Sequence, residues 1–159
     1  MVERGMFILT VAAAIGSGLI AGVFFAFSSF VMSGLGRLPA DHGIAAMQSI
    51  NITVLNFTFL GTFIGTAILC ALLAAASWFW WGQPNAILIM LASLIYIVGC
   101  FGVTIVCNVP MNNVLAAVQS NAPDAADTWS RYLRVWTNWN HVRTLAALVS
   151  AVLYVMTII

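Results

Sequence analysis

The stretch that decides the fold is residues 42–123, which read HGIAAMQSINITVLNFTFLGTFIGTAILCALLAAASWFWWGQPNAILIMLASLIYIVGCFGVTIVCNVPMNNVLAAVQSNAP. Its 82 residues include no Asp, Glu, Lys or Arg. A helix needs about 20 apolar residues to cross a bilayer, so this run is long enough for two crossings. Its strongest turn signal is Gly82-Gln83-Pro84-Asn85. We therefore predict spans at 51–77 and 86–109, joined as a tight helical hairpin.

Two further uncharged runs predict two further spans. Residues 5–36 lie between Arg4 and Arg37 and predict a span at 6–32. Residues 144–159 follow Arg143 without a charge and predict a span at 140–159. Pro110 is expected to end the third span, because proline lacks a backbone donor and disfavours helix at the preceding residue. The predicted fold is all-α: a four-transmembrane-helix bundle in a single domain, residues 1–159.

The composition excludes a soluble globular domain. Of the 159 residues, 63% are hydrophobic and 6% are charged, and the mean hydropathy is +1.06. Soluble domains carry about 25% charged residues, so nine ionised side chains cannot cover a water-exposed surface. The expected surroundings are membrane lipid. A net charge of +1 gives no reason to expect nucleic acid as a partner.

The two longer connections, residues 37–50 and 110–139, are expected to carry short interfacial helices. Arg37, Arg131 and Arg134 lie in them, and the positive-inside rule then favours a cytoplasmic position. The expected location is the bacterial inner membrane. Tryptophan favours the headgroup level, and all six tryptophans fall near predicted span ends: Trp78, Trp80, Trp81, Trp129, Trp136 and Trp139.

Strongly polar side chains concentrate on the side of the long connections. They are Gln48, Asn51, Asn56, Asn108, Asn112, Asn113, Asn138, Asn140, His141 and Arg143. One interpretation is interhelical hydrogen bonding that holds the bundle together. The other is a cavity of modest polarity, fit for an amphipathic ligand. The pattern leaves both open.

Residues 141 and 143 are the main candidates for chemistry. An imidazole titrates near pH 6.5, so His141 is the candidate base, or else it hydrogen-bonds a neighbouring helix. Arg143 lies about 160° around the helix from His141, so a regular helix cannot aim both at one small site. Arg143 either snorkels to a lipid phosphate or binds an anion within an aromatic-lined pocket. The sequence does not decide between them.

No metal site is predicted. His42, His141 and Cys107 are a lesser alternative, because their spacing matches no zinc or haem motif. The spans contain no Asp or Glu, which argues against proton-coupled transport. Small residues recur on one face of the first span, as at Gly18 and Gly22. They indicate close packing within the bundle or in a homo-oligomer or membrane complex.

Several segments resemble the anthrone oxygenase-like integral membrane proteins, a family formerly described as a domain of unknown function. They are Ala21-Gly22-Val23-Phe24-Phe25-Ala26-Phe27-Ser28, Ala46-Met47-Gln48-Ser49-Ile50-Asn51, Asn108-Val109-Pro110-Met111-Asn112, and Trp136 with Asn140-His141-Val142-Arg143. The resemblance covers nearly the whole chain. It implies a small four-helix membrane protein, some relatives of which oxidise anthrones to anthraquinones with molecular oxygen and no obvious cofactor.

The resemblance implies a bound aromatic or quinone-like molecule and, for an enzyme, cofactor-independent oxygenase chemistry. Such chemistry needs a base, donors for an enolate oxygen and aromatic walls. From chemistry alone we expect His141 as catalytic base, and a substrate-binding set of Asn51, Asn108, Asn112, Arg143, Trp136 and Trp139. The alternative is a non-catalytic membrane subunit or a binding module for a lipid, pigment or protein partner.

Overall fold

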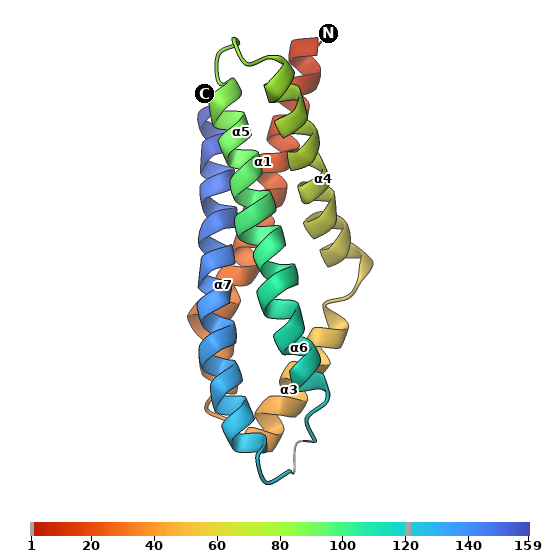
Figure 1. Cartoon of the computed structure of the whole chain (residues 1–159), viewed down its shortest axis with the longest axis vertical. Helices are drawn as coiled ribbons and strands as arrows, with labels where there is room; N and C mark the ends of the chain where they lie inside the picture. Colours follow the sequence, from red (N-terminus) through yellow and green to blue (C-terminus); the bar gives the residue numbers. More distant parts are fainter. Residues whose placement is uncertain (1, 120–121) are drawn as a thin grey trace.

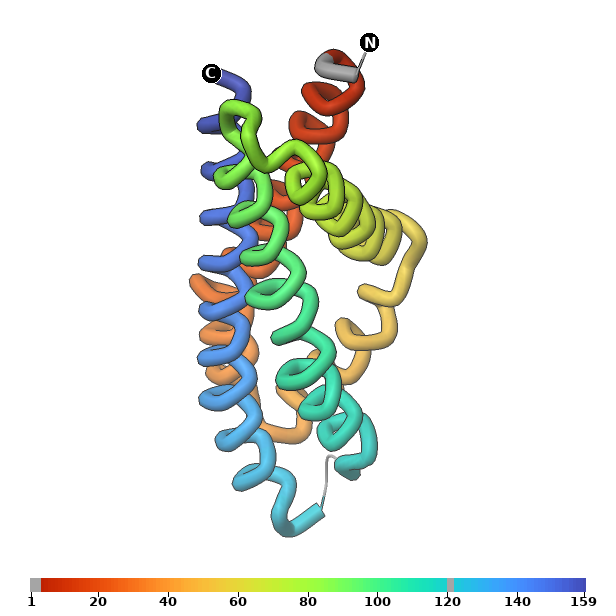
Figure 2. Tube along the Cα trace, turned by 45° about the horizontal axis from the view of Figure 1, so that its top comes forward, coloured from red at the N-terminus to blue at the C-terminus, as the bar shows by residue number. Residues whose placement is uncertain are grey.

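The computed structural model describes residues 2–119 and 122–159, and all regular structure within them is helical. The first long stretch is α1 (Val2–Ala26), which continues as the π-helical segment η1 (Phe27–Val31) and then as α2 (Met32–Leu35). Both termini and the α4–α5 turn lie at one end of the molecule (Figure 1). Figure 2 shows the same arrangement from a second direction.

The predicted hairpin of the second and third spans is confirmed. It consists of α4 (Phe57–Phe79) and α5 (Ala86–Leu94), joined by a turn in which Asn85 has the left-handed φ of 66°. The predicted start of the second span at residue 51 is wrong, since Asn51 belongs to the separate helix α3 (Ala40–Thr53). The physical reason is a local cap: Asn56 Oδ1 accepts a hydrogen bond from Phe59 N at 3.0 Å and so starts a new helix.

The third stretch runs further than predicted. After α5 it continues through π-helical segments η2 (Ile95–Gly102) and η3 (Thr104–Asn108) into α6 (Val109–Ala116), so the predicted end at residue 109 is wrong. Pro110 is the second residue of α6, directly after η3, so the helical stretch continues through the proline. The π-helical segment η3 ends two residues before the proline.

The last helix, α7 (Ala125–Met156), has 32 residues and begins well before the predicted fourth span. Of the two predicted interfacial helices, α3 is a separate short helix, whereas α6 is the end of the third stretch. Within the described residues, three stretches are long and apolar enough to cross a membrane: Arg4–Leu35, Phe57–Phe79 and Ala86–Ala116. The chain is therefore an all-helical protein with the character of an integral membrane protein.

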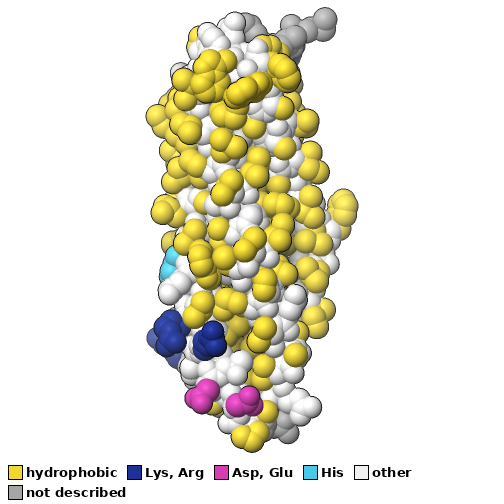
Figure 3. All heavy atoms as spheres, viewed as in Figure 1, with side chains coloured by type: hydrophobic (Ala, Val, Ile, Leu, Met, Phe, Trp, Pro, Cys, Tyr) yellow, Lys and Arg dark blue, Asp and Glu magenta, His cyan; other side chains and the backbone are white. Residues whose placement is uncertain are grey.

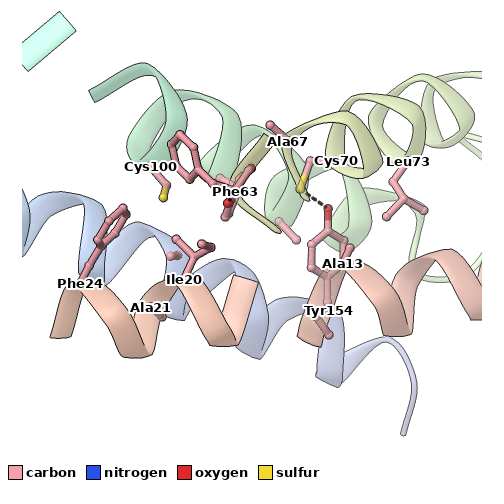
Figure 4. Packing of buried hydrophobic residues seen from close by; sticks show 14 residues of the cluster. Ala13, Ile20, Ala21, Phe24, Phe63, Ala67, Cys70, Leu73, Cys100 and Tyr154 are labelled. Carbon is pink, nitrogen blue, oxygen red and sulfur yellow. Dashed lines mark hydrogen bonds between the residues drawn. The ribbon is translucent and has the colours of Figure 1, made fainter. Parts of the chain in front are cut away.

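Two hydrophobic cores lie along the molecule. The larger core joins α1, α4, α5, η2 and α7, and Figure 4 shows part of it, including Phe24, Phe63 and Tyr154. The smaller core joins α2, α3, α6 and α7 around Met47, Trp129 and other side chains. Because Phe24 belongs to the first core and Trp136 to the second, the boundary between the cores lies between these two rings.

The glycines at close helix contacts are not Gly18 and Gly22, the two named from the sequence. A Cβ on Gly16 would lie 2.1 Å from Thr66 Oγ1, and one on Gly43 would lie 2.8 Å from the Trp129 ring. Gly18 and Gly22, in contrast, have nothing within 4 Å of such a Cβ. The expectation that these two pack within the bundle is therefore wrong. Helix rotation brings Ser17, Ile20 and Ala21 inward instead, since these residues are buried.

The molecular surface is largely apolar (Figure 3). Large side chains such as Leu19, Ile68 and Leu145 are more than half exposed, as expected of a surface in contact with lipid. On the face shown, charged side chains gather toward the end opposite the termini. Trp78, Trp80 and Trp81 are exposed at the α4–α5 turn, whereas Trp129 and Trp136 are buried inside the protein.

Candidate functional site

The inward face of α7 carries a buried arginine at the boundary between the two cores. Arg143 is only 6% exposed. Its guanidinium carbon lies 3.9 Å from the centroid of the Phe24 ring and 4.8 Å from that of the Trp136 ring. Cation–π attraction of this kind is strongest where water is excluded. We call Arg143, Phe24, Trp136, Asn140 and Thr104 the Arg143 cluster.

The hydrogen bonds of Arg143 go to neutral groups. Its Nε donates to Asn140 Oδ1 at 2.9 Å and its Nη1 donates to Thr104 Oγ1 at 3.4 Å. Among the described side chains, those of residues 4–119 and 122–159, the one ion pair is between His42 and Asp41, both well exposed. Arg143 thus carries a positive charge in the interior without a carboxylate partner in the part of the chain that is described. Buried charges are costly unless they are paired, so an anion paired with Arg143 would lower this cost.

Asn140 fixes the guanidinium in place. The asparagine is fully buried, and its Nδ2 donates to Phe24 O at 2.7 Å and to Ser28 Oγ at 2.6 Å. Both hydrogens of the Asn140 side-chain amide are therefore used, and its Oδ1 atom accepts the hydrogen bond from Arg143. Asn140 and Arg143 are three residues apart on one helical face, so α7 presents them together.

Trp136 joins the Arg143 cluster to a second set of polar groups. Its Nε1 donates to Asn112 Oδ1 at 2.7 Å, and the same oxygen accepts from the Tyr132 hydroxyl at 2.8 Å. The rings of Trp129, Tyr132 and Trp136 stack in sequence along α7. Burial raises the pKa of Tyr132, and the nearby Asn51 side chain partly opposes that rise. Tyr132 is therefore a neutral hydrogen-bond donor at physiological pH and no base.

Two amides in this region keep unused hydrogen-bonding capacity. Asn108 is fully buried and its Nδ2 donates to Trp136 O at 3.2 Å, while its Oδ1 has no partner. The Nδ2 of Asn51 is likewise buried and makes no hydrogen bond, although the Asn51 side chain lies near the Tyr132 hydroxyl. Unmet polar groups are expensive in a protein interior and are frequent where a ligand completes them.

The chain's π-helical segments supply the groups that meet this face of α7. Ser28 lies in η1, while Thr104 and Asn108 lie in η3. A π-turn is rare and is often found at functional sites, because its wider turn re-aims side chains. The segment η3 thus supplies Thr104 as a partner of Arg143, and η1 supplies Ser28 as a partner of Asn140.

A cavity of about 370 Å³ adjoins this region between α6 and α7. Its walls include Pro110, Met111 and Val135, with Arg131 among the lining side chains. Tyr132 belongs both to this wall and to the hydrogen-bonded set around Asn112. The volume falls within the range of small-molecule sites, about 300–1,000 Å³.

The structure brings together five of the seven site residues predicted from the sequence. They are Arg143, Trp136, Asn108, Asn112 and Asn51. Trp139 is 39% exposed, and His141 lies on the exposed face of α7. The expectation that His141 meets the asparagines in one pocket is wrong, because two helical steps turn it away from the buried side of Arg143. Its catalytic role stays a prediction.

The sequence reasoning did not assign roles to Asn140, Phe24 or Thr104. The i, i+3 spacing of Asn140 and Arg143 was an available signal. For Thr104 the signal was its place among the polar residues of the third predicted span, and for Phe24 it was its place in the segment 21–28 that resembles the family.

The metal alternative finds no geometric support in the described part of the chain. His42 pairs with Asp41 at 3.7 Å, with 71% of its side chain exposed, and Cys107 is half-buried on η3. No three His, Cys, Asp or Glu side chains of residues 4–119 and 122–159 gather closely enough to hold a metal ion. The groups that contact the Arg143 guanidinium are the Asn140 amide, the Thr104 hydroxyl and the rings of Phe24 and Trp136.

These features define a helical integral membrane protein with a buried, aromatic-walled cation between its helices. A family model described as anthrone oxygenase matches residues 55–153, more than half of the chain. The chain belongs to the anthrone oxygenase family. No curated protein and no solved structure shows significant similarity to it.

Proposed function

We propose that the chain is a four-span membrane protein that binds a planar aromatic molecule as its enolate or phenolate beside Arg143 and promotes its oxidation by molecular oxygen. The single observation that carries the proposal is the buried guanidinium of Arg143, held between two aromatic rings without a described carboxylate partner. Membership of the anthrone oxygenase family supports the same substrate class.

The fourth span in this proposal is the second half of α7. Leu145, Leu148 and Val152 are at least half exposed and would face lipid, while Asn140 and Arg143 face the interior. Asn140 and Arg143 lower the average hydropathy of the helix although they are buried inside the protein. Arg143 lies 13 residues before Met156, or about 20 Å along the axis, so it falls inside a hydrocarbon layer about 30 Å thick.

The ligand is expected to be flat and aromatic, because the rings of Phe24 and Trp136 flank the guanidinium. It is expected to be an anion, because no described carboxylate pairs with Arg143. Aromatic faces stack on tryptophan and phenylalanine, and an oxyanion pairs with guanidinium through charge-assisted hydrogen bonds. Entry is proposed through the cavity beside Tyr132. The free Oδ1 of Asn108 would accept a hydrogen bond from a phenolic hydroxyl.

The proposed reaction needs no reductant. Loss of a benzylic proton to water gives an anthrone enolate, whose oxygen pairs with Arg143. The electron-rich carbon forms a bond to one atom of molecular oxygen, and protonation gives a hydroperoxide. Loss of water from the hydroperoxide leaves the quinone carbonyl, so one anthrone and one oxygen molecule yield one anthraquinone and one water.

Arg143 would act by lowering the pKa of the bound carbon acid. Stabilising the enolate raises its concentration, and electrostatic stabilisation of this kind is worth about 10²–10³ in rate. Asn140 acts as a positioning residue, since it holds the guanidinium without touching substrate. His141 is left without a described path to this site, as it lies on the outer face of α7.

The test is anthrone oxidation by the protein in lipid nanodiscs, followed by oxygen uptake and anthraquinone absorbance. The expected stoichiometry is one oxygen per anthraquinone. Arg143→Met should remove most of the acceleration over empty nanodiscs, and Arg134→Met is the matched control because Arg134 is an exposed arginine of the same helix. Equal rates for the protein and empty nanodiscs would contradict the proposal.

The exposed glycines favour a second candidate function, assembly with another copy or a membrane subunit. Gly18 and Gly22 lie on the outer face of α1 with open space around them. Small residues allow close approach of membrane helices. Disulfide trapping of Gly18→Cys chains in membranes would support self-association, whereas the absence of a dimer would contradict it.

A further inference from the structure

A second cavity lies at the opposite end of the molecule from the charged surface. It has a volume of about 600 Å³ and lies where the start of α1, the end of α4, the α4–α5 turn and the end of α7 meet. Its lining includes Phe7, Trp80, Pro84, Ile89 and Ile158, which give it apolar walls. The volume is typical of a small-molecule site.

One wall of this cavity carries a buried hydroxyl without a partner. Ser77 is 2% exposed, and its Oγ makes no hydrogen bond. This differs from the usual behaviour of helical hydroxyls in this chain. Thr62, Ser93 and Thr104 each donate to the carbonyl four residues earlier, at 2.8 Å. The hydroxyl of Ser77 makes no such bond and is therefore left for another acceptor.

The other polar side chains that line the cavity are uncharged, and three of them make hydrogen bonds within the protein. Thr10 Oγ1 donates to Met6 O at 2.8 Å and Thr157 Oγ1 donates to Tyr154 O at 2.7 Å. Asn85 Nδ2 donates to Thr157 O at 3.4 Å. No charged side chain lines the cavity among the residues assigned to its wall. A charged ligand would find no oppositely charged side chain in this lining, whereas an uncharged ligand needs none.

We infer that this cavity is a second binding site, separate from the Arg143 cluster, for an uncharged carbonyl compound whose oxygen accepts a hydrogen bond from Ser77. The apolar walls hold the body of the molecule and the Ser77 hydroxyl gives it a fixed orientation. Both an aromatic ketone or quinone and the ester of a membrane lipid have this chemistry. The site is independent of the oxygenase proposal, because it shares no residue with the Arg143 cluster.

Benzophenone is a suitable probe, since it is a neutral aryl ketone that cross-links to nearby C–H bonds on irradiation. We expect labelling of the full-length protein in detergent to concentrate on lining residues such as Met6, Ile89 and Ile158. Ser77→Ala should reduce this labelling about tenfold, the effect of losing one buried hydrogen bond. Because the hydroxyl is unpaired, the same change should leave the melting temperature of the empty protein unchanged or raise it.

The matched control is Ser29→Ala. Ser29 is an exposed serine that donates to Phe25 O at 2.7 Å, and labelling of the cavity should be unaffected by its loss. Arg143→Met should also leave labelling unchanged, which separates this inference from the oxygenase proposal. Ala86→Phe is expected to fill the cavity and abolish labelling, because Ala86 lines it.

Competition identifies the source of the natural ligand. Displacement of benzophenone by anthraquinone indicates an aromatic ketone, and displacement by dioleoylglycerol indicates a lipid ester. Labelling that is equal in Ser77→Ala and the unmodified protein, or spread evenly over the lipid-facing surface, overturns the inference. Labelling that neither competitor displaces overturns it as well.

Discussion

Replacing Arg143 by methionine should separate function from stability. The change removes two cation–π contacts, to Phe24 at 3.9 Å and to Trp136 at 4.8 Å, each worth about 1–2 kcal/mol in a dry site. It also removes the donor to Asn140 Oδ1, which costs about 1–3 kcal/mol because that oxygen is left unpaired. Against these losses, it removes a charge from the membrane interior, which is worth about 2.5–3.5 kcal/mol.

The losses are somewhat larger than this gain, so we expect the free energy of unfolding to fall by about 2 kcal/mol and by no more than about 4 kcal/mol. Methionine fills much of the same volume and packs against aromatic rings. The anthrone oxidation rate, in contrast, should fall about 10²–10³-fold. The charge of Arg143 would thus serve the reaction and contribute little to the stability of the fold.

The assay pairs thermal unfolding in detergent with oxygen uptake in nanodiscs. Arg134→Met is the control, since it removes an exposed positive charge from the same helix and should change neither reading. A melting temperature that collapses together with activity would indicate a structural role for Arg143 and refute the reasoning. Full activity in a stable Arg143→Met protein would refute it equally.

Four further results are expected. Thr104→Asp supplies a carboxylate beside Nη1 of Arg143 and should weaken binding of a phenolate ligand at least about tenfold. Thr104→Val should weaken this binding much less, and titration with a hydroxyanthraquinone measures both affinities. Gly16→Ala should lower thermal stability by about 1–3 kcal/mol because its Cβ would meet Thr66, while Gly18→Ala should be neutral. His141→Ala should leave oxygen uptake unchanged, given its exposed position, and a loss above about tenfold would restore the base role predicted from the sequence. Tyr154→Phe should destabilise the core by about 1–2 kcal/mol, because it removes bonds to Ser93 and Cys70, and denaturation of the two proteins in parallel checks this.

The helical membrane character could be predicted from the sequence because it rests on local composition. Uncharged runs and the Gly82–Asn85 turn signal are properties of neighbouring residues, and the α4–α5 hairpin follows from them directly. The errors arose at helix ends. Asn56 caps the start of α4, and the third helical stretch continues through Pro110 after the π-helical segment η3. Both depend on backbone geometry that residue counting does not contain.

The candidate site could be predicted only in part. The sequence placed Arg143 and His141 on different faces of one helix but did not say which face turns inward. That choice depends on the partners of α7, above all the hydrogen bonds from Asn140 to Phe24 O and Ser28, which join positions 112 or more residues apart. The ring of Phe24 over the guanidinium depends on the same long-range contacts. No local pattern carries this information.

The most direct test of the buried cation is the phenol pKa of 1-hydroxyanthraquinone bound to the protein, read from the red shift of its visible spectrum on ionisation. Pairing of the phenolate with Arg143 should lower that pKa by about 1–3 units relative to the dye bound to Arg143→Met. An apolar site without an available charge would raise the pKa instead. A bound dye whose pKa is raised, or is the same in the two proteins, would contradict the account.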